Sequence, residues 1–234
     1  MELISTDTVQ NRVYQAIKEA IMTAHFEPGA SMTIRGLAST LGTSSMPVRE
    51  ALKRLIAERA VDSLPNRTYR IPILSKRRAL EIINVRILLE GEAAAMAAKK
   101  IRPEEIEELE FILEAGNKAL TDGDIGEYLV ENRKLHFSVY SASGNGTILP
   151  LIESLWLQYA PAHAVVFQAI KEDHDTMEIK GKTHHEDLVR AIRNKNGEAA
   201  RLAIKDDIMD MTVLSRFWDY FEDEVVTEAI SESS

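Results

Sequence analysis

Hydrophobic residues in the first 60 positions recur at intervals of three and four, which predicts a series of short amphipathic helices. The first helix begins after Asp7 or Thr8, either of which can accept hydrogen bonds from the free N–H groups at a helix start. After a Pro-Gly turn at 28–29, a second helix covers residues 35–41 and ends at Gly42. A third helix follows directly, so three helices are predicted before a β-prone region begins.

The third predicted helix has the composition of a helix that reads the major groove of DNA. Its apolar residues repeat at helical spacing and would face the core; they are Val48, Leu52 and Leu55. Arg49 and Lys53 lie on the opposite face, Pro47 fits the first turn, and Ser44 or Ser45 can cap the helix start. A helix that reads bases needs such a polar and basic front. An ordinary amphipathic surface helix has the same pattern, so the choice between the two interpretations depends on the neighbouring elements.

Two β-prone runs follow this helix, at residues 61–64 and 69–74. They flank a turn that begins with Pro65-Asn66, which predicts a β-hairpin with Arg67 at its tip. Three helices with a short turn between the second and third, followed by a hairpin, form a winged helix-turn-helix. Arg67 would then be able to reach a phosphate or the minor groove. We therefore expect residues 1–74 to form a DNA-binding domain.

From residue 75 onward the pattern is wholly helical. Proline and glycine divide it into six predicted helices, at about residues 75–100, 103–122, 125–142, 147–171, 176–194 and 198–221. No internal repeat of 20–50 residues is present, which argues against a solenoid. Residues 75–234 are therefore predicted to form an all-helical antiparallel bundle.

Composition narrows the class of protein. Apolar residues make up 45% of the 234 residues and charged residues 28%, as in soluble globular proteins. No apolar run approaches the roughly 18 residues of a membrane span, and the first residues lack the features of a signal peptide. The absence of cysteine excludes disulfides and thiolate metal sites. We expect a cytoplasmic protein with no membrane partner.

The net charge of −9 is unevenly distributed. Residues 1–75 hold 9 Lys and Arg against 7 Asp and Glu, a balance of +2. Residues 76–234 hold 19 against 30, a balance of −11. Such asymmetry indicates two modules with different partners, although +2 alone is weak evidence for nucleic acid.

Four polar residues interrupt the apolar faces of the predicted bundle. Asn132 and His136 are four residues apart on one helix, while His185 and Asp207 lie on the last two helices. The turn at Asn196 is 11 residues from each of the latter two. If these helices fold back antiparallel, the two side chains lie at the same height.

Two interpretations of this group are open. A buried carboxylate is costly unless it is paired or bound to a metal, and two imidazoles, a carboxylate and an amide oxygen can together ligate a divalent cation. The alternative is a hydrogen-bonded core network in which Asp207 pairs with a protonated histidine. On spacing alone, the network is the more common outcome.

Residues 8–74 resemble the DNA-binding domain of the GntR family of bacterial regulators. The matching segments are Pro28-Gly29, Leu37-Ala38 and Pro47-Val48-Arg49-Glu50-Ala51-Leu52. The resemblance implies that arginines of the second and third helices, here Arg35 and Arg49, contact the operator. Ser45 and Thr68 depart from the arginine and glycine usual at their positions. The DNA contacts predicted in all are Arg35, Ser44, Ser45, Met46, Arg49, Lys53 and Arg67.

Residues 76–234 resemble the helical effector domain (FCD type) of the FadR branch of that family. The matching segments are 86–90, His136 ahead of 142–145, and His185 with the apolar residues that follow it. Many members hold a divalent metal with one aspartate and three histidines. Asn132 takes the usual aspartate position here and Asp207 the usual third histidine position. The metal ligands so predicted are Asn132, His136, His185 and Asp207, for zinc, nickel or manganese.

The same resemblance assigns a role to Arg86 and Glu90. Their i, i+4 spacing is that of an ordinary helix salt bridge. In the resembling domains the arginine faces the ligand cavity and helps to hold a carboxylate, a task suited to a bidentate guanidinium. We therefore expect both residues in an effector site.

Together these observations predict a mainly α protein in which a winged helix-turn-helix (1–74) precedes an all-helical ligand-binding and dimerisation domain (75–234). We interpret it as a homodimeric transcription regulator, a repressor, that binds double-stranded operator DNA and responds to a small carboxylate effector. The competing hypothesis is a metal-dependent hydrolase with an accessory DNA-binding module. No Glu or Ser stands out as its base or nucleophile, so the regulator is favoured.

Overall fold

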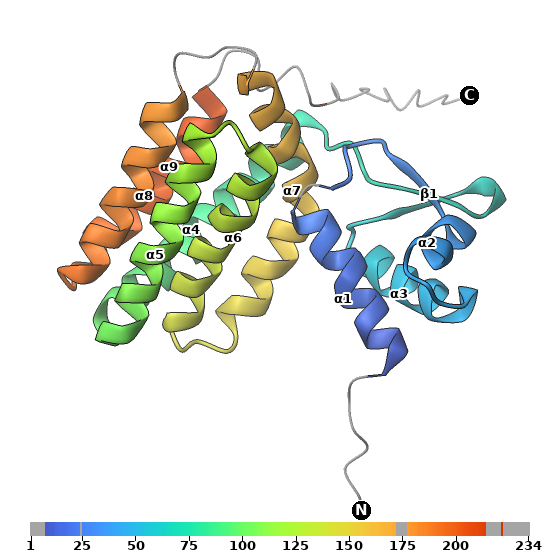
Figure 1. The fold of residues 1–234 in the computed structure, drawn as a ribbon, viewed down its shortest axis with the longest axis horizontal. Helices are drawn as coiled ribbons and strands as arrows, with labels where there is room; N and C mark the ends of the chain where they lie inside the picture. The colour runs from blue at the N-terminus through green and yellow to red at the C-terminus, as the bar shows by residue number, and fades with distance from the viewer. Residues whose placement is uncertain (1–7, 24, 172–176, 214–220, 222–234) are drawn as a thin grey trace, which may run out of the picture.

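A small unit of short helices and strands lies beside a bundle of longer helices in the computed structural model (Figure 1). The structure describes residues 8–23, 25–171, 177–213 and 221. The predicted fold class, a winged helix-turn-helix followed by a helical bundle, is confirmed. Within the described residues, no helix is both long enough and apolar enough to cross a membrane.

The N-terminal unit contains the three predicted helices and a three-stranded sheet. Its elements are α1 (Val9–Met22), β1 (Ser31–Thr33), α2 (Ile34–Thr40), α3 (Ser45–Ala57), β2 (Asp62–Leu64), the 3-10 turn η1 (Pro65–Arg67) and β3 (Thr68–Arg70). The sheet is antiparallel with the order β1-β3-β2, so that Thr68 of β3 lies opposite Thr33 on one side and Leu64 on the other. The wing is therefore β2 and β3, and β1 joins it from the chain before α2.

Burial of one face explains why these helices form where the periodicity places them. Thr8 caps α1 by accepting a hydrogen bond from the backbone N–H of Asn11 at 3.3 Å. The residues of α3 that are fully buried are Val48, Ala51, Leu52 and Leu55. At roughly 25 cal/mol per Å² of buried apolar surface, such side chains supply most of the free energy that fixes the helix. The polar face of α3 is left on the outside.

The C-terminal unit is a bundle of long helices. Its described elements are α4 (Lys76–Lys100), α5 (Pro103–Thr121), α6 (Ile125–Ala142), α7 (Ile148–Lys171), α8 (Met177–Arg193) and α9 (Gly197–Val213). Side chains of Ser75 and Asp124 cap α4 and α6, and Pro103 opens α5. The last helix was predicted to reach about residue 221. Its described part ends at Val213, and residues 214–220 lie outside the described residues.

A tight turn sets the position of α9 against α8 and α4. Lys195 adopts a left-handed conformation (φ 52°), and the Asn196 side chain accepts a hydrogen bond from the N–H of Ala199 at 3.1 Å. A Cβ on Gly197 would lie 2.9 Å from the carbonyl oxygen of Ala95 in α4. Because this approach leaves no room for a side chain, glycine allows α9 to start directly against α4.

The helix α1 connects the two units. It packs against α7, and Lys18 of α1, although a lysine, is buried and pairs with Glu153 of α7 at 2.9 Å. Glu19 of α1 pairs with Arg133 of α6 at 2.5 Å. One continuous hydrophobic core extends from α1 into the bundle. Helices of the bundle therefore touch the DNA-binding unit directly.

Candidate functional site

The predicted DNA contacts lie on one exposed set of elements: α2, α3 and the wing. All seven side chains are exposed: Arg35, Ser44, Ser45, Met46, Arg49, Lys53 and Arg67. Met46 is 62% exposed and therefore accessible from this side of the helix. Lys53 pairs with Glu50 at 2.8 Å on the same exposed face.

The structure corrects the predicted cap of α3. Ser44 occupies the N-cap position with an extended backbone, but its side chain makes no cap hydrogen bond, and Ser45 is already the first helical residue. Neither serine caps the helix with its side chain as predicted. Both serines are exposed at the start of the helix, a position at which backbone N–H groups can bind a phosphate.

Arg67 lies at the tip of the wing, as predicted, in a strained conformation. Its φ of 59° is in the left-handed region that favours glycine. Such a conformation costs a non-glycine residue of order 1–3 kcal/mol. The left-handed residue of the turn is therefore Arg67, and the next residue, Thr68, is the first residue of β3.

Three of the four predicted metal ligands come together in the bundle. His136 of α6, His185 of α8 and Asp207 of α9 each offer one donor atom, and these atoms lie within 4.8 Å of one another. The two histidine Nε2 atoms are 3.2 Å apart. Each is also close to an Asp207 oxygen, at 3.4 Å from His136 and 3.3 Å from His185. Both histidines are buried, and the Asp207 side chain is 19% exposed.

These separations are close to what one cation requires, with His136 and His185 facing different oxygens of the Asp207 carboxylate. Ligand atoms that each lie about 2.1 Å from a tetrahedral metal are roughly 3.4 Å from one another. Two neutral imidazoles and one carboxylate are a donor set suited to a divalent transition metal. The residues present therefore fit such an ion.

Asn132, the fourth predicted ligand, is buried in α6 four residues before His136. It lies on the same face of that helix, because residues i and i+4 are neighbours. An amide oxygen is the weakest donor of the four for a transition metal.

Arg86 and Glu90 form a fully buried ion pair on α4. Arg86 Nε donates to Glu90 Oε1 at 2.6 Å, and a second guanidinium nitrogen donates to Oε2 at 3.4 Å. Burial lowers the pKa of Arg86, but the Glu90 carboxylate more than offsets this, and the pKa lies above its ordinary value. The guanidinium carbon also lies 4.7 Å from the ring centre of Trp156 and 5.0 Å from that of Tyr159. Arg86 is therefore charged and held in place.

A tyrosine that sequence reasoning missed joins the two groups. The Tyr140 hydroxyl donates to Glu90 Oε2 at 2.6 Å and lies 2.9 Å from Nδ1 of His136. Burial, and then the charge and hydrogen bond of Glu90, raise the pKa of Tyr140 well above its ordinary value. Its spacing of four residues from His136 was the available signal, but a tyrosine on an apolar helix face is usually core. Glu90 is thus shared between Arg86 and Tyr140.

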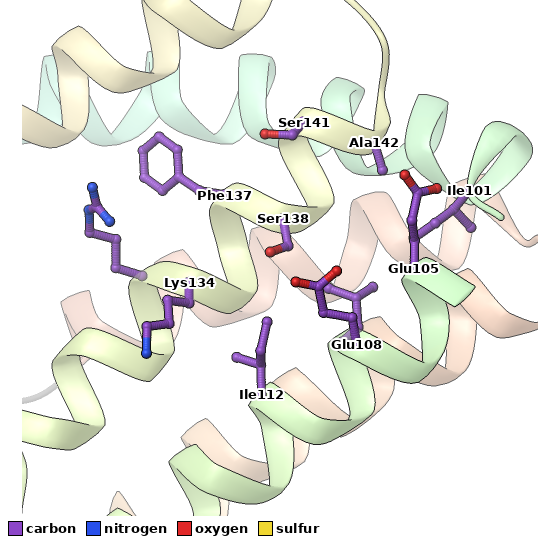
Figure 2. A pocket seen from close by; sticks show the side chains of 11 residues that line it. Ile101, Glu105, Glu108, Ile112, Lys134, Phe137, Ser138, Ser141 and Ala142 are labelled. Carbon is purple, nitrogen blue, oxygen red and sulfur yellow. The ribbon is translucent and has the colours of Figure 1, made fainter. Parts of the chain in front are cut away.

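A separate hollow of about 470 Å³ lies between α5 and α6. Figure 2 shows Glu105 and Glu108 on the α5 side and Lys134, Phe137 and Ser138 on the α6 side. None of the predicted metal or effector residues lines it. It is therefore distinct from the buried cluster.

Comparisons with known proteins identify both units. Residues 9–71 match the family described as bacterial regulatory proteins, gntR family, and residues 81–209 match the FCD domain. The HTH-type transcriptional regulator McbR of Escherichia coli K12 is 28% identical over 209 residues, which cover 89% of this chain and 93% of McbR. The solved structure of E. coli McbR/YncC has a TM-score of 0.78 at 27% identity, with coverage of 87% and 94%.

Two further relatives have names that describe regulation. A probable D-xylose utilization operon transcriptional repressor of Paenarthrobacter nicotinovorans is 27% identical over 201 residues, 86% of each chain. An uncharacterized HTH-type transcriptional regulator of Agrobacterium vitis is 35% identical over 126 residues, 53% of this chain and 74% of the relative. The matched families and relatives are transcriptional regulators, and nothing among them supports the hydrolase alternative.

Proposed function

The chain belongs to the GntR family of bacterial regulatory proteins and carries an FCD domain, and from this premise we propose that a metal ion and a small carboxylate, bound in that domain, control its affinity for operator DNA. The chain is a DNA-binding transcriptional regulator. The single observation that carries the proposal is the convergence of His136, His185 and Asp207 beside the buried Arg86–Glu90 pair. We also infer that it acts as a repressor, an inference supported by a relative named as an operon repressor.

The metal ligands in this proposal are His136, His185 and Asp207, with Asn132 as a further donor. A zinc, nickel or manganese ion held there would supply open coordination positions for an oxygen ligand. The three protein ligands come from α6, α8 and α9. Ligation would therefore hold these three helices together through a shared ion.

Arg86 is the residue proposed to hold the effector's carboxylate. It is buried, charged and fixed by Glu90 on one edge of its guanidinium, which leaves other N–H donors for a ligand. Glu90 cannot itself contact a carboxylate favourably, because both carry negative charge. Its role is to hold Arg86 in position.

Two contacts can carry a change in the bundle to the DNA-binding unit. The helix that holds His136 also holds Arg133, which pairs with Glu19 of α1. The helix α7 holds Trp156, whose ring centre is 5.5 Å from that of His136, and Glu153, which pairs with Lys18 of α1. A shift of either helix would change the position of α1 against the bundle. The coupling free energy between two such sites is typically 1–3 kcal/mol.

We propose further that the protein acts as a homodimer in the bacterial cytoplasm, where its operator lies. A two-fold protein favours a two-fold site, so the operator is expected to be an inverted repeat. Selection of bound sequences from a random duplex pool tests this. Enrichment of inverted repeats supports the proposal, and enrichment of unpaired single half-sites contradicts it.

Replacing Arg49 with alanine tests direct reading of the selected sequence. We expect a loss of about 1–3 kcal/mol in binding free energy on the selected duplex, because an arginine on the exposed face of α3 can contact a base edge. On unrelated DNA the loss should be much smaller. The control is Arg102→Ala, which removes an exposed arginine at the start of α5. An equal loss on both duplexes would make Arg49 a phosphate contact instead.

A further inference from the structure

We propose that Tyr140 is a positioning residue that determines which nitrogen of His136 faces the metal site. The inference rests on the metal site proposed above and concerns a residue outside the ligand set. It depends on the direction of two consecutive hydrogen bonds, from His136 to Tyr140 and from Tyr140 to Glu90. The three residues come from two helices, α4 and α6.

The Tyr140 hydroxyl donates its one hydrogen bond to Glu90. Glu90 is 0% exposed and pairs with Arg86 at 2.6 Å, so it is a carboxylate that only accepts hydrogen bonds. The Tyr140 hydroxyl lies 2.6 Å from its Oε2 and donates to it. A tyrosine hydroxyl has one proton, so toward any other neighbour it can act only as an acceptor.

The hydrogen bond from Tyr140 to Glu90 also determines which nitrogen of His136 carries the proton. Nδ1 of His136 is 2.9 Å from the Tyr140 oxygen, and two acceptors at that distance would repel each other. Nδ1 therefore carries the proton and donates it to Tyr140. In a neutral imidazole the other nitrogen, Nε2, then carries a lone pair and no proton. That is the nitrogen 3.2 Å from His185 and 3.4 Å from Asp207.

Without Tyr140, the opposite tautomer becomes favourable. A proton on Nε2 of His136 could be donated to the Asp207 carboxylate 3.4 Å away. That arrangement would produce the hydrogen-bonded network considered above and remove a metal ligand. Tyr140 thus shifts the buried cluster from a self-satisfied network toward a metal site. Because Glu90 also fixes Arg86, one carboxylate orients both the metal ligand and the effector-binding arginine.

Tyr140→Phe tests the proposal, since it removes the hydroxyl and little else. We expect zinc affinity, measured by competition with a chromogenic chelator, to fall about 10- to 100-fold, as losses of such outer partners do. Nitrogen-15 spectra of metal-free wild type should show His136 protonated on Nδ1, with Nε2-protonated imidazole gaining population in the variant. A purely structural role would not move this tautomer signal.

The matched control is Tyr14→Phe. Tyr14 is also a buried tyrosine that donates to a carboxylate, at 2.7 Å to Glu58, but it lies in α1. That variant should keep wild-type zinc affinity and the wild-type His136 tautomer. Equal effects of the two substitutions would mean a general loss of packing and would overturn the proposal.

Two results separate this inference from the proposed function. If wild type binds no zinc, the metal site is wrong, yet the metal-free spectra still decide the role of Tyr140. If His136 in wild type is protonated on Nε2, or if Tyr140→Phe leaves its tautomer unchanged, the positioning role is wrong whatever the zinc affinity.

Discussion

Replacing His185 with alanine is expected to weaken zinc binding by at least about 100-fold. The substitution removes one of only three strong donors in the cluster, and even loss of an outer partner of a metal ligand costs 10- to 100-fold. Chelator-treated protein, titrated with zinc and followed by calorimetry, gives the affinity. Elemental analysis of protein purified without chelator gives the bound metal independently.

His184→Ala is the matched control for this experiment. His184 is the adjacent histidine, and it is partly exposed rather than buried in the cluster. The His184→Ala variant should bind zinc with the wild-type affinity. Wild type and His185→Ala with the same stoichiometry and affinity would show that any metal binds elsewhere in the chain.

The second large effect is on stability. Glu90→Ala should lower the free energy of unfolding by about 3–5 kcal/mol, because it leaves the buried charge of Arg86 without its counter-charge. It also leaves the Tyr140 hydroxyl without its acceptor. Urea unfolding followed by circular dichroism measures the change.

An exposed pair on the same helix provides the comparison. Arg77 and Glu81 have the same i, i+4 spacing at 3.3 Å, but their side chains are 70% and 46% exposed. Glu81→Ala should therefore cost less than about 1 kcal/mol. If the two substitutions cost the same, burial does not govern the energetics of the Arg86–Glu90 pair.

Helical periodicity and one turn were enough to predict that two site residues lie at the same level along neighbouring antiparallel helices. His185 and Asp207 are each 11 residues from Asn196, and antiparallel helices joined by a tight turn bring such positions together. The structure places His185 Nε2 3.3 Å from an Asp207 oxygen. The prediction succeeded because it needed only local geometry and a rigid connection.

The hydrogen bonds that complete the site were not predictable in the same way. Glu90 and Tyr140 are 50 residues apart and lie on helices that are not consecutive. Their contact depends on how α4 packs on α6, which no local period encodes. For the same reason the pairing of β1 with β3 could not be read from the short extended segment before α2.

Local backbone detail and the join between the two units also escaped prediction. Serine at a helix start usually caps it, yet Ser44 does not. Lysine is mostly exposed in proteins, but α1 packs on two sides, and its second partner α7 buries Lys18 against Glu153. Each case is one where tertiary contacts override a local preference.

Control of DNA binding by the bundle site is tested most directly by the affinity of the protein for a selected operator duplex. Fluorescence anisotropy would compare metal-free protein with protein in zinc and acetate, for wild type and for His185→Ala. We expect zinc and acetate to change the wild-type affinity by about 5- to 150-fold, with no change in His185→Ala. Wild type that binds zinc yet keeps the same operator affinity would contradict it.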